Sequence, residues 1–292
     1  MDLLTVFTPT FNRADKIRNL YLSLCAQNNK NFIWLVVDDG SSDETANLIN
    51  SWIKDDKIKI KYIYQENGGK CSALKNGIGE CDSEWFFCVD SDDILLENAI
   101  DILLSSMLKK DKDCIGSIFP MLGITTNFGW VPEFVNAVDI VDLRVKYNVK
   151  ESAILLRTDL LKKVDIPIFI DEKFLSEEII YIQLSKFGKF YVDNRAFYQA
   201  EYLSDGLTSN IFRVWVKNPK GTFLLLNMRY KYYQHYSFGV RMKERIKTIL
   251  NYNALCMVTN EKILQETPDK FLSRALYLPS ILWKKIRFSN KN

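Results

Sequence analysis

Short apolar runs alternate with amphipathic segments over the first 110 residues. Runs of strand length cover 3–8, 32–37 and 85–89, and residues 58–64 alternate apolar with polar positions. Between these runs, after Asn12, Asp43, Gly69 and Glu97, apolar residues recur three and four positions apart, as on the buried face of a helix. The alternation predicts an α/β fold with a mostly parallel sheet and helices on both faces, and Pro9 is expected to end the first strand.

The pattern changes in the second half of the chain. Residues 153–156 and 190–200 predict further strands, with a helix over about 176–187 between them. Beyond Asn210 the chain is predicted to be helical as far as Phe288. We therefore predict a sheet domain over residues 1–209 and a C-terminal helical region over residues 210–292.

Composition and charge narrow the class of protein. A hydrophobic content of 47% is ample for a core, and a net charge of +3 is too small to indicate nucleic acid as a partner. The single histidine excludes a His-rich metal site, and the six cysteines lack paired zinc-ligand spacing, which favours a reducing compartment. Neither a signal peptide nor ~18 consecutive apolar residues is present, so a cytoplasmic protein without a transmembrane helix is expected.

Acidic residues follow two of the predicted strands. Asp38 and Asp39 come after the run 32–37, and Asp90, Asp92 and Asp93 come after the run 85–89. The carboxyl ends of parallel strands share one edge, where ligands bind, so these carboxylates are expected to lie together. Their mutual repulsion calls for a positive partner, and oxygen ligands suit Mg²⁺ or Mn²⁺, which also bind phosphates. An Asp-rich turn without a ligand is the alternative interpretation.

Four short motifs support the ligand-binding interpretation. In chain order they read TPTFNR at 8–13, VVDDGSSD at 36–43, NGGK at 67–70 and VDSDD at 89–93. Together they resemble the family 2 glycosyltransferases of GT-A fold, and bacterial enzymes that assemble capsule, exopolysaccharide or O-antigen sugars in particular. A looser likeness continues through Glu177-Glu178 and residues 201–208. The resemblance implies inverting transfer of a sugar from a nucleotide-sugar, expected to be a UDP-sugar, to a hydroxyl of a glycan or lipid-linked acceptor.

The resemblance also implies roles for individual residues. Asp39 would accept a hydrogen bond from the uracil ring, and Gly69 and Lys70 would lie at the diphosphate. The loop bordering the nucleotide would comprise Thr8, Pro9, Thr10, Phe11 and Arg13.

The acidic turn would hold the metal and the sugar. Asp92 would bind a divalent cation, Mn²⁺ or Mg²⁺, between the two phosphates, and Asp90 would face the ribose or the water shell of that cation. Asp93 would position a sugar hydroxyl or a metal-bound water, with Ser91 in the same turn.

A general base is implied farther along the chain. Glu178, assisted by Glu177, would deprotonate the acceptor hydroxyl. The family usually carries Asp at the second position of this pair, so the Glu178 side chain is longer than the usual one. Acidic residues at the start of a helix also complement its dipole, which is the alternative role for the pair.

The C-terminal segment and the overall function each leave alternatives open. Residues 276–288 mix bulky apolar residues with Lys and Arg, which predicts either peripheral contact with an anionic membrane, at the inner face of the plasma membrane, or a helix docked on its own domain.

Alternative functions are a catalytically inactive GT-A-like binding or scaffold protein and a sugar-1-phosphate nucleotidyltransferase, although the latter usually has a Gly-rich basic loop where this chain has residues 9–11. The sequence predicts neither the sugar nor the oligomeric state.

Overall fold

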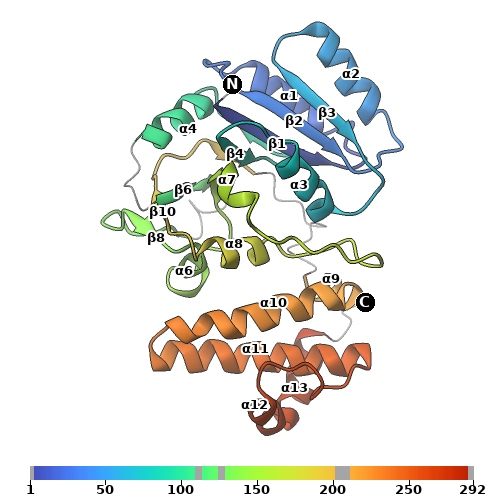
Figure 1. Ribbon diagram of the computed structural model, residues 1–292, viewed down its shortest axis with the longest axis vertical. Helices are drawn as coiled ribbons and strands as arrows, with labels where there is room; N and C mark the ends of the chain where they lie inside the picture. Colours follow the sequence, from blue (N-terminus) through green and yellow to red (C-terminus); the bar gives the residue numbers. More distant parts are fainter. Residues whose placement is uncertain (1–2, 109–113, 124–128, 201–210, 289–292) are drawn as a thin grey trace. The chain divides into compact units, whose positions relative to one another are not determined.

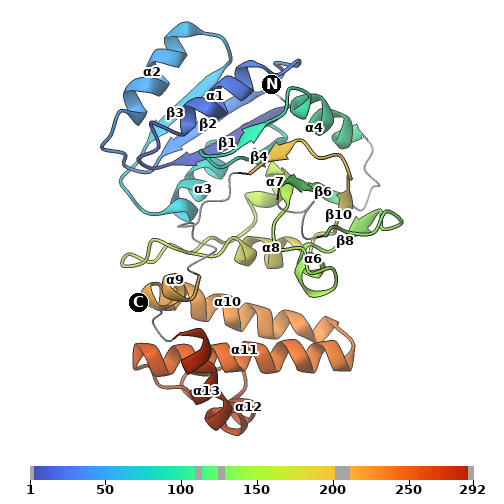
Figure 2. The ribbon, with the colours of Figure 1, turned by 180° about the vertical axis from the view of Figure 1, so that it is seen from behind.

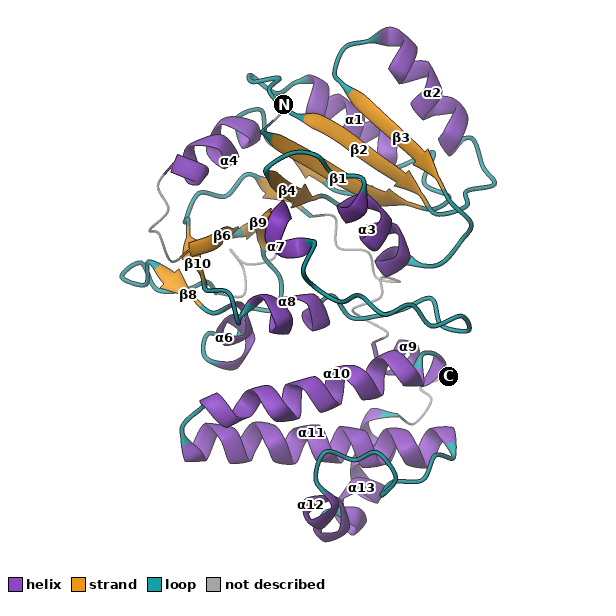
Figure 3. Ribbon diagram, viewed as in Figure 1, coloured by secondary structure: helices purple, strands orange, loops and turns teal. Residues whose placement is uncertain are grey.

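The protein was analysed as a computed structural model, which describes residues 3–108, 114–123, 129–200 and 211–288. The chain forms two compact units, Met1–Ile166 with Gln183–Tyr202 and Pro167–Ile182 with Leu203–Asn292. The first unit contains the described strands, and the second consists mainly of helices (Figures 1 and 3). The predicted domain boundary at residue 209 falls outside the described residues and stays a prediction.

The main sheet has eight strands in the order β3-β2-β1-β4-β9-β6-β10-β8, and a three-stranded sheet has the order β5-β11-β7. Strands β1 to β4 are mutually parallel, as are β6 and β10, whereas β8 and β9 run antiparallel to their neighbours. The mostly parallel sheet is thus confirmed. The strands are β1 (Leu4–Thr10), β2 (Ile33–Asp38), β3 (Ile60–Tyr64), β4 (Trp85–Cys88), β5 (Ile94–Leu95), β6 (Cys114–Phe119), β7 (Met121–Leu122), β8 (Ala137–Val138), β9 (Ala153–Arg157), β10 (Lys189–Val192) and β11 (Tyr198–Gln199).

Two predicted strand boundaries were wrong. Strand β1 continues through Pro9, which lies opposite Val37 of β2. On its other side β1 pairs with β4 only as far as Phe7, so Pro9 needs no backbone N–H there. The predicted strand over residues 190–200 is divided into β10 and β11, which belong to different sheets because the chain bends between them.

Helices cover both faces of the parallel strands, as predicted. Leu4 and Val6 of β1 share one core cluster with apolar residues of α1, α2 and α4. Phe7 points to the other face, where α3 packs so closely that a Cβ at Gly77 would lie 2.2 Å from the Phe7 ring. The helices of this unit are α1 (Ile17–Cys25), α2 (Thr45–Asp55), α3 (Lys70–Gly79), α4 (Ala99–Leu108), α6 (Ile140–Val145) and α7 (Thr158–Leu161), and α8 (Glu178–Leu184) lies at the division between the units.

The second unit is built on two long helices, α10 and α11, which lie side by side in both views (Figures 1 and 2). Helix α10 begins at a proline, and the buried Glu172 carboxylate accepts hydrogen bonds from the amides of Lys220 (2.7 Å) and Gly221 (2.8 Å), which satisfies two donors of its first turn. Its helices are α9 (Ile211–Lys217), α10 (Pro219–Tyr232), α11 (Phe238–Thr259), α12 (Lys270–Ala275) and α13 (Tyr277–Arg287), with a 3₁₀ turn at Tyr233–His235. Among the described residues, every helix is too short or too polar to cross a bilayer.

Candidate active site

The loop after β1 is fastened to the loop after β2. Asn12, with a positive φ of 50°, donates its amide to Ser41 Oγ (2.8 Å) and accepts from the amide of Ser42 through Oδ1 (2.8 Å). The amide of Ala14 donates to Asp43 Oδ2 (3.1 Å). These exchanges hold the two predicted nucleotide-binding loops together at the carboxyl edge of the sheet.

The residues predicted to border the nucleotide differ in exposure. Thr8, Pro9 and Thr10 are buried, and Thr8 Oγ1 accepts a hydrogen bond from Trp34 Nε1 (3.0 Å). Among the described residues, the buried hydroxyl of Thr10 has no hydrogen-bond partner. Phe11 and Arg13 are exposed, so they are the two side chains of this group that a nucleotide could contact from solvent.

Asp38 serves the protein's own loop. Its Oδ1 accepts from the amide of Ser41 (2.8 Å), and its Oδ2 accepts from the hydroxyl of Tyr62 (2.8 Å). Burial and the Asp38 carboxylate raise the pKa of Tyr62. The two bonds leave Asp38, fully buried, with a structural role in the β2–α2 connection.

Asp39 organises the start of α3. Its side chain is 4% exposed, and its Oδ1 accepts from Gln65 Nε2 (2.7 Å) and the amide of Gly68 (2.8 Å). Its Oδ2 accepts from the amide of Gly69 (2.7 Å), whose φ of 89° is one that glycine adopts readily. The carboxylate therefore fixes the turn that delivers Lys70.

Lys70 connects that turn to the acidic residues after β4. Its Nζ lies 2.7 Å from Asp90 Oδ1 and 3.0 Å from Asp90 Oδ2. Asp39, Gly69, Lys70 and Asp90 thus form a continuous chain of contacts from the end of β2 to the end of β4. These contacts agree with the expectation that the two acidic clusters meet at one edge of the sheet.

The acidic turn itself is held by a buried tyrosine. The Tyr198 hydroxyl donates to Asp93 Oδ2 (2.6 Å) and accepts from the amide of Asp90 (3.1 Å). Asp93 and Ser91 are each 6% exposed. Burial, followed by the charges of Asp90 and Asp93, raises the pKa of Tyr198 well above its ordinary value, so the phenol stays a donor. Asp93 therefore fastens the turn to β11.

Asp92 is a carboxylate of this turn whose ionised form the surrounding protein disfavours. Burial and the charge of Asp90 raise its pKa, while Arg13 and Lys70 act in the opposite direction. A divalent cation between Asp90 and Asp92 would relieve this repulsion. Within the described part of the chain, however, no three acidic, His or Cys side chains gather to hold an ion alone. A cation here would need ligand oxygens as well, which matches the habit of Mg²⁺ to bind through one or two carboxylates and substrate phosphates.

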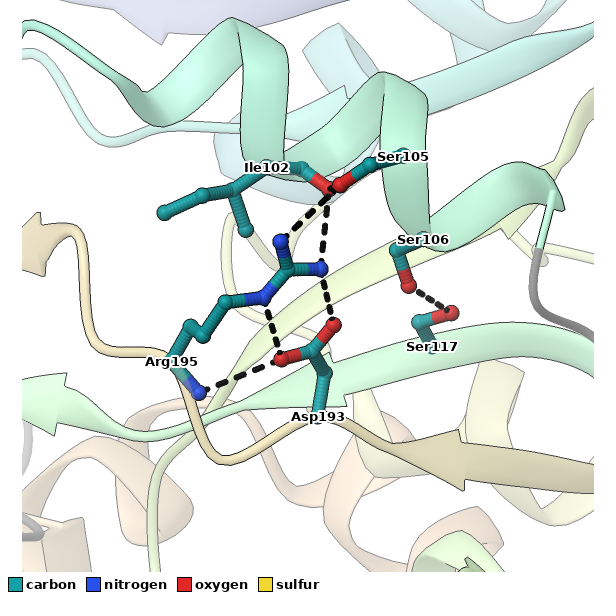
Figure 4. A network of polar contacts seen from close by, with 6 residues as sticks. All are labelled: Ile102, Ser105, Ser106, Ser117, Asp193 and Arg195. Carbon is teal, nitrogen blue, oxygen red and sulfur yellow. Dashed lines mark hydrogen bonds and ion pairs between the residues drawn. The ribbon is translucent and has the colours of Figure 1, made fainter.

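A separate polar network holds the connection between β10 and β11, which leads to Tyr198 (Figure 4). Arg195 Nε donates to Asp193 Oδ1 (2.8 Å), Nη2 donates to Asp193 Oδ2 (2.5 Å), and Nη1 donates to Ser105 Oγ of α4 (2.9 Å). The network ties the connection between β10 and β11 to α4. Sequence reasoning missed Tyr198 because it lay inside a predicted strand with no motif around it.

The predicted general bases belong to the second unit. Both Glu178 oxygens pair with Arg229, with Nε 2.7 Å from Oε1 and Nη2 against Oε2. Glu177 Oε2 accepts from the Tyr181 hydroxyl (3.0 Å). The arginine partner lies 51 residues along the chain and was not predicted. The motif predicted at residues 201–208 falls outside the described residues.

Comparison with known sequences agrees with the motif assignment. A family model described as Glycosyl transferase family 2 matches residues 5–170. Glycosyltransferase GlyG of Streptococcus pneumoniae is 30% identical over 39% of this chain and 38% of its own length, and the chain spans little more than a third of the first curated relatives it matches. A teichoic acid poly(glycerol phosphate) polymerase of Staphylococcus epidermidis is 26% identical over 90% of this chain and 34% of its own length. A GalNAc(5)-diNAcBac-PP-undecaprenol beta-1,3-glucosyltransferase of Campylobacter jejuni is 26% identical over 74% of this chain and 72% of its own.

Solved structures share the fold. Residues 1–349 of TarS from S. aureus, in complex with UDP-GlcNAc, superpose with a TM-score of 0.61 at 17% identity, covering 98% of this chain and 91% of that one. The mannosyltransferase PcManGT of Pyrobaculum calidifontis, in complex with GDP-Man and Mn²⁺, superposes with a TM-score of 0.58 at 16% identity, covering 98% and 84%. At these identities the likeness establishes the GT-A fold.

Proposed function

Because the chain belongs to glycosyl transferase family 2, and is therefore a glycosyltransferase, we propose that it moves a sugar from a UDP-sugar to a hydroxyl of a glycan or lipid-linked acceptor in bacterial surface polysaccharide synthesis. The observation that carries the donor assignment is the chain of contacts from Asp39 through Gly69 and Lys70 to Asp90. These contacts bring the Lys70 ammonium next to the carboxylates at the sheet edge where α/β proteins bind ligands.

The donor would lie across the loops that follow β1, β2 and β4. Phe11 and Arg13 are exposed beside the buried Thr8, Pro9 and Thr10, and would border the base and the ribose. In the proposal a lone pair of Asp39 accepts the uracil imide N–H, in addition to the amides that it already accepts. Lys70 would then exchange part of its contact with Asp90 for the donor diphosphate.

Asp90 and Asp92 would hold a divalent cation, Mn²⁺ or Mg²⁺, with the diphosphate supplying further oxygens. When bound, this cation would neutralise negative charge on the departing nucleoside diphosphate. The raised pKa of Asp92 supports the assignment because the protein alone leaves that carboxylate poorly compensated. Asp93 and Ser91 would keep the turn in place through Tyr198 and the buried backbone.

Glu178 would act as the general base that accepts the proton of the acceptor hydroxyl, with inversion at the anomeric carbon. The two bonds from Arg229 fix the orientation of its carboxylate. Glu177, bonded to Tyr181, would be its helper. This assignment rests on the motif and on these contacts within the second unit.

Thermal unfolding with a panel of nucleotide-sugars tests the donor proposal. We expect UDP-sugars with Mn²⁺ to raise the Tm, and we expect the increase to shrink with EDTA. Release of UDP on incubation with acceptor would distinguish a glycosyltransferase from a nucleotidyltransferase, which releases pyrophosphate. A chain that binds no nucleotide-sugar under any of these conditions would contradict the proposal and favour the scaffold interpretation.

A further inference from the structure

Helix α13 packs on α11 through its polar and aromatic side. Ser280 is fully buried, Trp283 Nε1 donates to Asn251 Oδ1 (2.7 Å), and Lys284 Nζ donates to the carbonyl of Met257 (3.2 Å). The inward side of α13 is therefore occupied within the second unit, and its bulky aliphatic residues lie elsewhere.

Those aliphatic residues face solvent. Leu278, Leu282 and Ile286 are 74%, 62% and 63% exposed, and their spacing of four residues puts them along one face of α13. Phe271 of α12 is 82% exposed. Apolar residues that gather on one exposed face of a helix are typical of surfaces that contact a partner.

The same two helices carry charge of one sign. Between residues 270 and 287 the chain has five cations and no acidic residue, and the cations are Lys270, Arg274, Lys284, Lys285 and Arg287. Arg287 lies over the rings of Phe212 (5.2 Å) and Trp283 (5.0 Å), which holds this guanidinium at the end of α13. The partner of this face must therefore be apolar in part and negatively charged.

We propose that the α12–α13 face, defined by Phe271, Leu278, Leu282 and Ile286 with the surrounding cations, binds the surface of an anionic lipid bilayer. Aliphatic side chains would enter the boundary between headgroups and acyl chains while Lys and Arg contact anionic headgroups. A second copy of the chain fits less well, because a symmetric contact would set this cationic face against itself, even though Lys284 is turned inward to the Met257 carbonyl. The proposal concerns a surface of the second unit and is independent of the proposed reaction.

Vesicle flotation tests the proposal with the full chain. Vesicles of phosphatidylcholine alone are compared with vesicles of equal parts phosphatidylcholine and phosphatidylglycerol. We expect binding to the second kind only, weakening as salt is raised, with a loss of about fivefold for each cation removed at Arg274 or Lys285 by change to Gln. The triple variant Leu278→Gln/Leu282→Gln/Ile286→Gln should lose at least about tenfold in partitioning.

A control replaces three apolar residues elsewhere that are even more exposed, Leu108→Gln/Phe134→Gln/Ile170→Gln, and should bind as the unchanged protein does. The proposal is overturned if the unchanged protein does not float with anionic vesicles, or if the α13 triple variant floats as well as the control. A change of oligomeric state in the triple variant without vesicles would also overturn it, because the partner would then be a second copy. UDP-dependent stabilisation, measured without vesicles, should be the same in both triple variants, which separates this outcome from the fate of the donor proposal.

Discussion

At the scale of single residues, Asp92 connects stability with ligand binding. Its raised pKa means that folding favours the protonated carboxyl, a contribution that is full below the ordinary value of 3.8 and lost as the pH rises through the folded pKa. At neutral pH the ionised Asp92 therefore lowers the stability of the ligand-free protein. A bound divalent cation would neutralise this same carboxylate charge.

Asp92→Asn should consequently stabilise the ligand-free protein at pH 7, by about 1–2 °C in Tm. The advantage should disappear as the pH falls through the raised pKa of Asp92 toward the ordinary value of 3.8, because Asp92 itself then becomes protonated. The variant should also lose the Mn²⁺-dependent part of the stabilisation by UDP. A Tm series against pH, with and without UDP and Mn²⁺, measures both effects, and an unchanged metal-dependent gain would exclude Asp92 as a ligand.

Tyr198 is predicted to matter for metal-dependent binding although it need not touch the donor. Tyr198→Phe removes the donor to Asp93 and the acceptor of the Asp90 amide, so we expect a loss of about 1–3 kcal/mol in stability and a weaker Mn²⁺-dependent response to UDP. Tyr62→Phe is the matched control because it removes a comparable phenol bond to Asp38. If both variants keep the same metal dependence, Tyr198 is only a packing residue.

Glu178→Gln should lower kcat by about 100-fold or more while leaving the response to UDP intact. The change also removes the charge partner of a mostly buried Arg229, so the Tm should fall and activity must be measured where the variant is folded. Glu177→Gln should have the smaller effect on kcat. Activity unchanged in Glu178→Gln, with only the Tm reduced, would assign Glu178 to a structural ion pair.

At the scale of elements, the close approach of α3 to β1 sets the geometry of the lysine turn. Helix α3 starts at Lys70 and contacts β1 at Gly77, where an added Cβ would lie 2.2 Å from the Phe7 ring. Because Gly77 and Lys70 belong to one helix, the packing of α3 on the sheet and the position of Lys70 beside Asp90 are coupled.

Gly77→Ala should lower the free energy of unfolding by about 1–3 kcal/mol, because Phe7 must move to admit the methyl group. Gly79→Ala, in the same helix with no atom within 4 Å of the added Cβ, should instead raise it by up to about 1 kcal/mol. Urea unfolding of the two variants gives both values. A similar stabilisation by both variants would show that helix propensity, and not the contact with Phe7, dominates at this helix.

At the scale of the whole molecule, the unfolding of each compact unit can be followed through a buried cysteine that belongs to it. Cys81 belongs to the first unit and Cys256 to the second, and both are 1% exposed. Burial and Glu261 raise the pKa of Cys256 to about 12, so its thiol is also unreactive in the native state. Labelling of either thiol therefore reports opening of its unit.

All of the predicted nucleotide ligands, from Thr8 to Asp93, lie in the first unit. In moderate urea, UDP with Mn²⁺ should therefore slow the labelling of Cys81 more than that of Cys256. Mass spectrometry of pulse-labelled peptides measures the two rates. Equal protection would mean that the units unfold together or that the second unit contributes to binding.

The amino-acid sequence by itself was enough to assign the alternation of strands and helices and the edge at which Asp39 and Asp90 meet. Hydrophobic periodicity is local, and parallel strands necessarily share a carboxyl edge, so both follow without coordinates. The motifs around Asp39, Lys70 and Asp92 are likewise short, and the family assignment that they suggested is confirmed by the match over residues 5–170.

Only the tertiary structure decided which partner each charged group takes. Tyr198 reaches the acidic turn from 108 residues away, Arg229 meets Glu178 across 51 residues, and Asp39 accepts amides from a loop about 30 residues on. Such contacts depend on how several elements pack at once, and no local pattern encodes them. The outward apolar face of α13 is of the same kind: its residues are plain in the sequence, but their exposure depends on which side of the helix α11 covers.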